Sequence, residues 1–197
     1  MPATSQGRLV VVSGPSGAGK TSVLQRVFEL CRAPLCRSVS ATTRPPRPGE
    51  TDGVEYHFLS DGEFQSLQKD GNFLECFEVF GQGYWYGTLW SEVTTGLEAG
   101  RWVVLEIDVH GAMEVLKRFP DAVTLFIRPG TREELEQRLR GRGTESEPSV
   151  RRRLDIADRE LALADRYQYQ IINDRFDQAV EDICRILNSL WEKSRND

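Results

Sequence analysis

The sequence has no hydrophobic segment that could cross a membrane. Its apolar runs fall well short of the ~20 residues that a membrane-spanning helix needs. Residues 1–7 hold no basic stretch followed by a hydrophobic one, so no secretory signal peptide is expected. These absences exclude a helical membrane span, and we expect a cytoplasmic protein with no membrane partner.

Cysteine is scarce, and no two cysteines form a C-x-x-C pair. The four are Cys31, Cys36, Cys76 and Cys184. Scattered cysteines in a chain of this size are typical of reduced thiols rather than of a disulfide framework. The sequence therefore predicts free thiols and a reducing compartment.

An excess of positive charge is also missing. The chain has 25 Lys and Arg against 30 Asp and Glu, which gives a formal net charge of −5. The surface as a whole does not attract nucleic acid, so any phosphate-binding surface must be local. Arginine supplies 21 of the 25 basic residues, so a lysine at a special position is the more informative signal.

Short apolar runs alternate with helical patterns along most of the chain. Such alternation is typical of an α/β fold, in which a parallel sheet carries helices on both faces. We expect buried strands over residues 9–12, 102–109, 123–127 and 169–172, and helices over residues 21–31, 111–119, 131–142, 149–167 and 174–191.

Two segments depart from this alternation. Residues 37–90 predict a small α+β insertion, with strands at 37–40, 54–58 and 73–80 and a helix at 61–69. Residues 138–153 are charged and contain glycine, which is typical of a mobile segment over a site.

The stretch Gly14-Pro15-Ser16-Gly17-Ala18-Gly19-Lys20-Thr21 matches the pattern G-x-x-x-x-G-K-[ST] in full. Glycines let the backbone curl so that successive N–H groups point inward, and the following helix adds its positive N-terminal end. Lys20 is a compact charge for the β- and γ-phosphates, and Thr21 offers a hydroxyl to Mg²⁺. Because the motif stands between a predicted buried strand and a predicted helix, it indicates a site for a nucleoside triphosphate.

A second anion site is indicated by Arg44-Pro45-Pro46-Arg47. Proline fixes φ and pushes the preceding residue to an extended conformation, so two guanidinium groups are held on a stiff segment. That arrangement suits a bidentate grip on a phosphate, to which Tyr56 and Tyr86 could each add a hydroxyl. A solvated proline-rich turn with ordinary tyrosines is the alternative.

Two carboxylates could recognise a base. Asp108 ends the strand predicted at 102–109, on the ligand side of a parallel sheet, and Glu75 follows Phe73-Leu74. Guanine presents two adjacent donors, N1–H and N2–H₂, which suit carboxylates, whereas adenine would place a lone pair against one of them. Either residue could instead be ordinary solvated surface.

Four segments in this order resemble the guanylate kinases, which transfer a phosphoryl group from ATP to GMP. They are VVSGPSGAGKTS, SVSATTRPPRPGETDGVEYHF, LEIDVHGA and LRGRGTESE, and the resemblance covers residues 8–190. It implies a P-loop core at 1–36, 91–129 and 156–197, a GMP-binding domain at 37–90 and a mobile lid at 130–155.

The resemblance also implies a role for each site residue. Catalysis would rest on Lys20, Arg44, Arg142 and Arg153. Magnesium would be the cofactor, with Thr21 as a ligand and Glu106 near it through water. ATP would be bound by Gly14, Pro15, Ser16, Gly17, Ala18, Gly19, Lys20, Thr21, Ser22, Arg138 and Asn173. GMP would be bound by Ser40, Arg44, Arg47, Tyr56, Glu75, Tyr86, Thr88 and Asp108.

Three questions stay open at this level. Residues 81–88 read GQGYWYGT where the family usually reads GNYYGT, so either Tyr84 or Tyr86 could meet the GMP phosphate. A kinase of another phosphorylated acceptor, such as a ribose bisphosphate, and a non-catalytic binding module of the same fold are the rival functions. The oligomeric state, monomer or homodimer, is not predicted.

Overall fold

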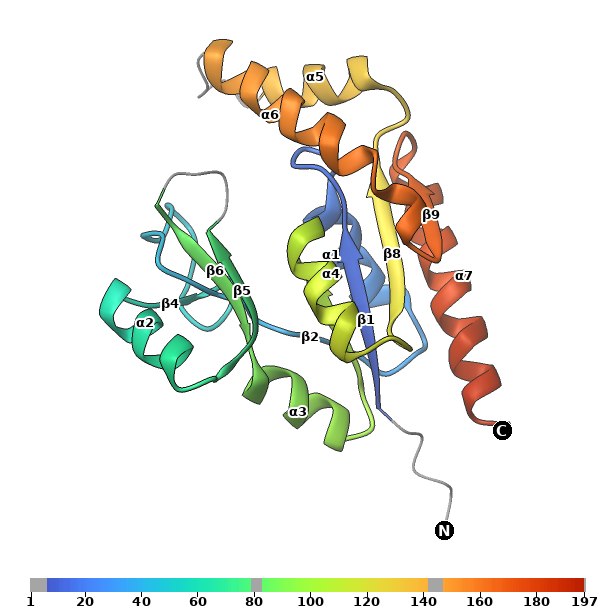
Figure 1. The fold of residues 1–197 in the computed structure, drawn as a ribbon. Helices are drawn as coiled ribbons and strands as arrows, with labels where there is room; N and C mark the ends of the chain where they lie inside the picture. The colour runs from blue at the N-terminus through green and yellow to red at the C-terminus, as the bar shows by residue number, and fades with distance from the viewer. Residues whose placement is uncertain (1–6, 79–82, 142–146, 197) are drawn as a thin grey trace.

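A computed structural model describes residues 7–78, 83–141 and 147–196. Its larger sheet has five strands, all parallel, in the order β2-β7-β1-β8-β9 (Figure 1). The strands are β1 (Arg8–Ser13), β2 (Leu35–Arg37), β7 (Trp102–Glu106), β8 (Val123–Arg128) and β9 (Tyr169–Ile172). The predicted parallel α/β core is thus confirmed, with one strand more than expected.

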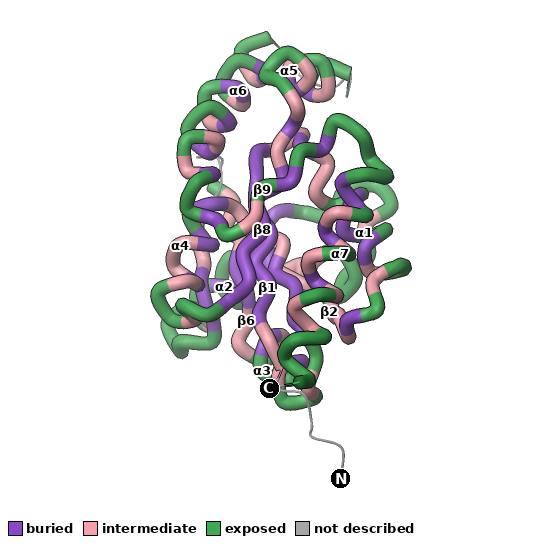
Figure 2. Tube along the Cα trace, turned by 90° about the vertical axis from the view of Figure 1, so that its right-hand side faces the viewer, coloured by how far each residue is buried: buried purple, intermediate pink, exposed green. Residues whose placement is uncertain are grey.

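The central strand β1 is buried on both faces (Figure 2). Val10 and Val12 pack against α1 (Lys20–Leu30) and α7 (Phe176–Ser194), whereas Leu9 and Val11 pack on the side of α3 (Trp90–Glu98) and α4 (Val109–Arg118). Side chains alternate along a strand, so a continuous apolar run serves two cores at once. Each fully buried Val or Leu contributes about 2 kcal/mol. This burial anchors the loop that leaves the carboxyl end of β1.

The smaller sheet stands apart from the first and has four strands in the order β4-β3-β6-β5. Its core is formed by Ala41, Phe64 and Phe73, with the two phenylalanine rings stacked 4.4 Å apart. A capping box between Ser60 and Glu63 begins the helix α2 that covers it. The elements are β3 (Ala41–Thr42), β4 (His57–Phe58), α2 (Asp61–Lys69), β5 (Phe73–Glu78) and β6 (Trp85–Leu89).

Helices α5 (Arg132–Arg140) and α6 (Glu147–Leu161) pack on each other and lie over the loop that follows β1 (Figure 1). They share a separate apolar cluster, in which Leu135 and Leu139 of α5 meet Val150, Leu154 and Ala157 of α6. A short 3₁₀ turn, η1 (Ala164–Arg166), then leads into β9. The helix predicted at 149–167 therefore ends earlier, at Leu161.

Four elements between 35 and 101 differ from the sequence-based expectation: β2 belongs to the large sheet, and β3, β6 and α3 were not predicted. The strand predicted at 37–40 is wrong, because the strand is β2, which pairs with β7 in the large sheet. Helix α3 was not predicted, since Thr94, Thr95 and Gly96 weaken its intrinsic helix propensity. Tertiary packing of Val93 and Gly96 against the sheet stabilises it instead.

The described part of the chain contains no helix long and apolar enough to cross a membrane. Cys31, Cys36, Cys76 and Cys184 are all free and partly exposed. The expectation of free thiols is therefore confirmed.

We expect Gly96→Ala to destabilise the fold although alanine is the better helix former. A Cβ at Gly96 would lie 2.5 Å from Cγ2 of Val103 and 3.0 Å from Sγ of Cys36. Overpacking of this kind costs about 1–3 kcal/mol, which outweighs the gain of ~1 kcal/mol in helix propensity. Urea unfolding should show the loss.

Gly62→Ala in α2 is the matched control, because a Cβ there meets nothing within 4 Å. It should be neutral or slightly stabilising. If Gly96→Ala proved as stable as Gly62→Ala, the close packing of α3 on the sheet would be contradicted.

Candidate active site

The loop between β1 and α1 is held in a conformation that only glycine adopts easily. Gly14 has φ 143°, and a Cβ there would lie 1.9 Å from the carbonyl oxygen of Ile127 in β8. Gly19 caps α1 with φ 85° and supplies no capping side chain. The first N–H groups of α1 are therefore presented toward the loop, where an anion is favoured.

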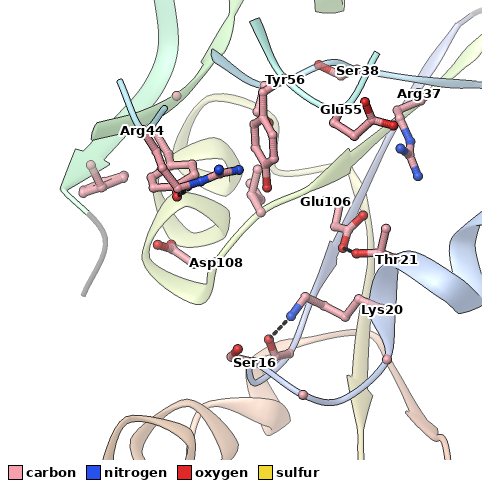
Figure 3. Close-up of a pocket in the computed structure, with 18 of the residues that line it drawn as sticks. Ser16, Lys20, Thr21, Arg37, Ser38, Arg44, Glu55, Tyr56, Glu106 and Asp108 are labelled. Carbon is pink, nitrogen blue, oxygen red and sulfur yellow. Dashed lines mark hydrogen bonds between the residues drawn. The ribbon is translucent and has the colours of Figure 1, made fainter. Parts of the chain in front are cut away.

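Lys20 and Thr21 begin helix α1 and point to one side of the loop (Figure 3). Nζ of Lys20 donates to the carbonyl oxygens of Gly14 at 2.6 Å and Pro15 at 3.1 Å. The Thr21 hydroxyl donates to Oε1 of Glu106 at 2.6 Å. Glu106 is the last residue of β7, which lies next to β1, so sheet pairing brings its carboxylate to the start of α1.

Arg44 approaches from the smaller sheet, across the space from Lys20 (Figure 3). Only 8% of its surface is exposed. Its guanidinium donates to the Tyr86 hydroxyl at 3.2 Å, to the carbonyl of Pro45 at 2.7 Å and to Glu50 at 2.9 Å. It also lies 5.4 Å from the centroid of the Tyr56 ring. Arg44 is thus fixed before any anion arrives.

Glu75 is a second buried polar residue of the smaller sheet, and it lines the same cavity as Arg44. Its Oε1 accepts a hydrogen bond from the Thr88 hydroxyl at 2.7 Å, and its Oε2 would lie 3.0 Å from a Cβ at Gly111. Burial raises the pKa of the Glu75 carboxyl to about 7, the Thr88 hydrogen bond opposes this, and the charge of Asp108 adds to it. A buried carboxyl with a free face is suited to accept hydrogen bonds from a ligand.

One cavity of about 440 Å³ joins the glycine loop to the Arg44 side. Sixteen residues with a role implied by the sequence line it: Gly14, Ser16, Gly17, Gly19, Lys20, Thr21, Ser22, Ser40, Arg44, Arg47, Tyr56, Glu75, Tyr86, Glu106, Asp108 and Arg153. Both anion sites therefore open into the same space.

Several implied residues lie outside that lining. Asn173 and Arg138 lie behind the loop, where Nδ2 of Asn173 donates to the carbonyl of Ala18 at 2.8 Å and Arg138 donates to the carbonyl of Asn173 at 2.6 Å. Thr88 is buried behind Glu75, to which its hydroxyl donates a hydrogen bond. Pro15 contributes its carbonyl to Lys20. Arg142 lies outside the described residues.

Two details of the site differ from the expectation. Asp108 does not end a strand: β7 stops at Glu106, and Asp108 caps α4 by accepting the Gly111 N–H at 2.7 Å. The two arginines are not held alike, because Arg44 is buried and Arg47 is exposed. Of the two tyrosines that the sequence left open, Tyr86, the expected one, contacts Arg44 and lines the cavity, whereas Tyr84 is not among the described lining residues.

Three lining carboxylates, Glu50, Glu55 and Glu160, were missed by sequence reasoning. Glu50 accepts from both the Arg44 guanidinium and the backbone N–H of Arg47, and the Arg44 hydrogen bond lowers the pKa of its carboxyl. The turn signal Pro48-Gly49 just before Glu50 could have placed it. Glu160 continues the buried spacing of Leu154 and Ala157 on α6, a position where a carboxylate is unusual.

Comparison with known sequences identifies the family. The family model described as guanylate kinase matches residues 6–190. The chain belongs to the guanylate kinase family. A guanylate kinase of Rhodopirellula baltica is 56% identical over 182 residues, which are 92% of this chain and 87% of that relative. A guanylate kinase of Gloeobacter violaceus is 50% identical over 183 residues, 91% of this chain and 86% of that relative.

The fold agrees with a solved guanylate kinase. The crystal structure of guanylate kinase from Anaplasma phagocytophilum matches with a TM-score of 0.77 at 30% identity. The match covers 95% of this chain and 87% of that one. The guanylate kinase fold thus accommodates both sheets and the helices over the loop.

We expect Glu75→Gln to stabilise the protein in a pH-dependent way. The raised pKa means that the native state binds more protons than the unfolded chain between about pH 4.5 and 7, so wild-type stability falls as pH rises through that window. At pH 8 the variant should be about 2 kcal/mol more stable, and at pH 4 equal. Chemical denaturation across this range measures the difference.

Glu78→Gln removes an exposed carboxylate from the same strand and serves as the control. Its stability should follow that of the wild type at every pH. A stability difference between Glu75→Gln and the wild type that does not change with pH would contradict the burial of an ionisable carboxyl at Glu75.

Proposed function

We propose that this protein transfers the γ-phosphoryl group of ATP to GMP, giving ADP and GDP. The observation that carries the proposal is the single cavity of about 440 Å³ into which both Lys20 and Arg44 open. Two anion sites in one cavity suit a donor and an acceptor that both carry phosphate. Membership of the guanylate kinase family supports this choice of donor and acceptor.

The glycine loop would hold the ATP phosphates. Its backbone N–H groups and the N-terminal end of α1 favour the negative charge, and Lys20 exchanges the Gly14 and Pro15 carbonyls for phosphate oxygens. Arg153 lines the same cavity from α6. We assign Arg138 and Arg142 to the ATP side as well, and Asn173 to the surroundings of the adenine.

The residues beside the loop fit a magnesium ion. Magnesium prefers oxygen ligands and is usually held by one or two protein groups together with substrate phosphates. The Thr21 hydroxyl and the Glu106 carboxylate, 2.6 Å apart, form such a donor set, with Thr21 as the direct ligand and Glu106 acting through water. When bound, the ion would neutralise charge on the β- and γ-phosphates.

Arg44, Arg47, Tyr56 and Tyr86 would bind the phosphate of GMP. Arg44 is already oriented by Glu50 and Tyr86, so little ordering remains for substrate binding to supply. The guanine would meet Glu75 and Asp108, whose oxygens accept from N1–H and N2–H₂, with Ser40 and Thr88 beside them. Adenine has no matching pair of donors on that edge.

The transfer itself needs positioning and charge neutralisation rather than a general base. A phosphate oxygen of GMP attacks the γ-phosphorus of ATP, the bond to the β–γ bridging oxygen breaks, and ADP leaves with that electron pair. Lys20, Arg44, Arg142 and Arg153 stabilise the charge on the transferred group. We propose that residues 37–90 and 130–155 close over the core at 1–36, 91–129 and 156–197, which excludes water.

The two rival functions predict different sites. A kinase of a ribose bisphosphate would gain nothing from a buried carboxyl such as Glu75 facing the acceptor. A non-catalytic module of this fold has no need of a complete loop with Lys20. Both residues line the cavity here, and both favour the transfer to GMP.

We expect ATP-dependent turnover with GMP in the presence of magnesium, and little with AMP or ribose bisphosphate. Lys20→Met should lower kcat by about 10²–10³-fold, because a developing charge loses a preorganised cation. Lys117→Met is the control, since Lys117 is an exposed residue of α4. A coupled ADP assay with melting curves for each variant separates lost chemistry from lost fold. Turnover that prefers ribose bisphosphate, or none with any acceptor, rejects the proposal.

Glu75→Gln should raise KM for GMP and reduce the preference for GMP over AMP by about 10–100-fold, since an amide replaces one acceptor with a donor. The ratio of kcat/KM for the two nucleotides measures this. Glu78→Gln should leave the ratio unchanged. An unaltered ratio in Glu75→Gln would remove Glu75 from the guanine site.

A further inference from the structure

Glu92 is a partly buried carboxylate on α3 to which no role has been assigned so far. Its neighbour Val93 is fully buried against the large sheet, so this part of α3 is fixed to the core. Oε2 of Glu92 accepts the backbone N–H of Val39 at 3.1 Å, and Oε1 lies 3.0 Å from Nε2 of His57 in β4. One side chain anchored on the core therefore contacts two segments that belong to the smaller sheet or lead into it.

Val39 lies in the short connection from β2 of the large sheet to β3 of the smaller one (Figure 1). On one side of it, the N–H of Ser38 donates to the carbonyl of Val104 in β7 at 3.0 Å. On the other side, the carbonyl of Ser40 accepts the N–H of His57 at 2.9 Å. Backbone pairing thus passes from one sheet to the other at Val39, whose own N–H is held by the Glu92 side chain.

The two residues that Glu92 contacts are direct neighbours of two residues assigned to the acceptor. Val39 precedes Ser40, and Tyr56 precedes His57. Ser40 and Tyr56 both line the cavity, and Tyr56 points into it (Figure 3). Because the backbones of Ser40 and His57 are hydrogen-bonded, a shift of one segment carries the other with it. The Glu92 carboxylate is therefore placed to set the position of the acceptor side relative to the core.

Stabilisation of the fold accounts for this arrangement poorly. The His57 and Glu92 side chains are 30% and 26% exposed, and an ion pair that water reaches stabilises a protein only weakly. A surface ion pair also has no need of a third partner, whereas the second oxygen of Glu92 is used by the backbone of the connection. The geometry favours orientation of the connection over support of the fold.

We propose that Glu92 is a positioning residue for the phosphate acceptor, which ties the connection between the two sheets to β4 and so places Ser40 and Tyr56 at the cavity. The inference rests on the proposed transfer to GMP, because Ser40 and Tyr56 are assigned to that nucleotide. It predicts that loss of Glu92 weakens the binding of GMP and leaves the binding of ATP unchanged, since the segments that Glu92 contacts hold no residue assigned to ATP.

Two substitutions at Glu92 separate its hydrogen bonds from its bulk. Glu92→Ala removes both contacts and should raise KM for GMP about tenfold, with KM for ATP within about twofold of wild type. Glu92→Gln keeps an oxygen for the Val39 N–H and should raise KM for GMP less than about threefold. A coupled ADP assay measures both constants, and calorimetric titration with GMP alone measures the same loss as Kd without turnover. Glu98→Ala, which removes an exposed carboxylate from the same helix, is the control and should change neither constant.

His57→Ala removes only the contact with β4 and should raise KM for GMP about threefold. If this contact acts through Glu92, the variant with both His57→Ala and Glu92→Ala should match Glu92→Ala alone, because the two losses are not independent. Melting curves of each variant show whether the fold is kept. If Glu92→Ala does not fold, His57→Ala decides, and an unchanged KM for GMP in that variant overturns the proposal.

Other results also overturn it. They are a KM for GMP within about twofold of wild type in Glu92→Ala, an equal rise of KM for ATP, a greater loss in Glu92→Gln than in Glu92→Ala, and effects of the His57 and Glu92 substitutions that multiply. A residue that only supports the fold would lower the melting temperature without separating the two KM values.

The wild type in the same assays separates this inference from the proposed function. If the wild type neither binds nor phosphorylates GMP, the proposed function fails, and the inference fails with it. If the wild type does both and Glu92→Ala does so equally well, only the role of Glu92 fails.

Discussion

The parallel pairing of β1 with β7 determines where the charged groups of the site stand. In that register Val12 lies opposite Glu106. The end of β1, from which the glycine loop leaves, therefore lies beside the end of β7, which carries the Glu106 carboxylate. Helix α1 begins directly after the loop, and its second residue, Thr21, meets Glu106 without any further element. Pairing with β8 on the other side places the Ile127 carbonyl so close to Gly14 that no side chain fits at that position.

The site carries polar groups that the fold alone would not favour. Glu75 and Glu160 are buried carboxyls with raised pKa values, and Arg44 is a buried guanidinium compensated by Glu50. Groups of this kind lower stability unless ligands or partners complete them. The apolar clusters on the two faces of the large sheet supply the stability that offsets the cost of these buried charged groups.

Sequence reasoning succeeded where the chemistry is local. Gly14 to Thr21 are consecutive residues, so the spacing of their glycines and the position of Lys20 predict a phosphate-binding loop without knowledge of the tertiary structure. The alternation of apolar runs likewise predicted the parallel core. The reasoning failed where partners are distant in the chain. Helix α3 depends on β7 for its packing, and Glu160 lines the same cavity as Lys20 from a position 140 residues later. The assignment of Asp108 to a strand failed for a related reason, since a capping carboxylate and a strand-end carboxylate look alike in sequence.

The contacts behind the loop bear on how tightly any nucleotide can be held. Arg138 already donates to the carbonyl of Asn173, and Asn173 to that of Ala18. Arg44 is likewise occupied by Glu50, Tyr86 and Pro45. A phosphate that recruits either guanidinium therefore trades one set of hydrogen bonds for another, and only the difference adds to affinity. The same exchange runs in reverse when a phosphate leaves, since the protein's own oxygens can take back each guanidinium hydrogen bond.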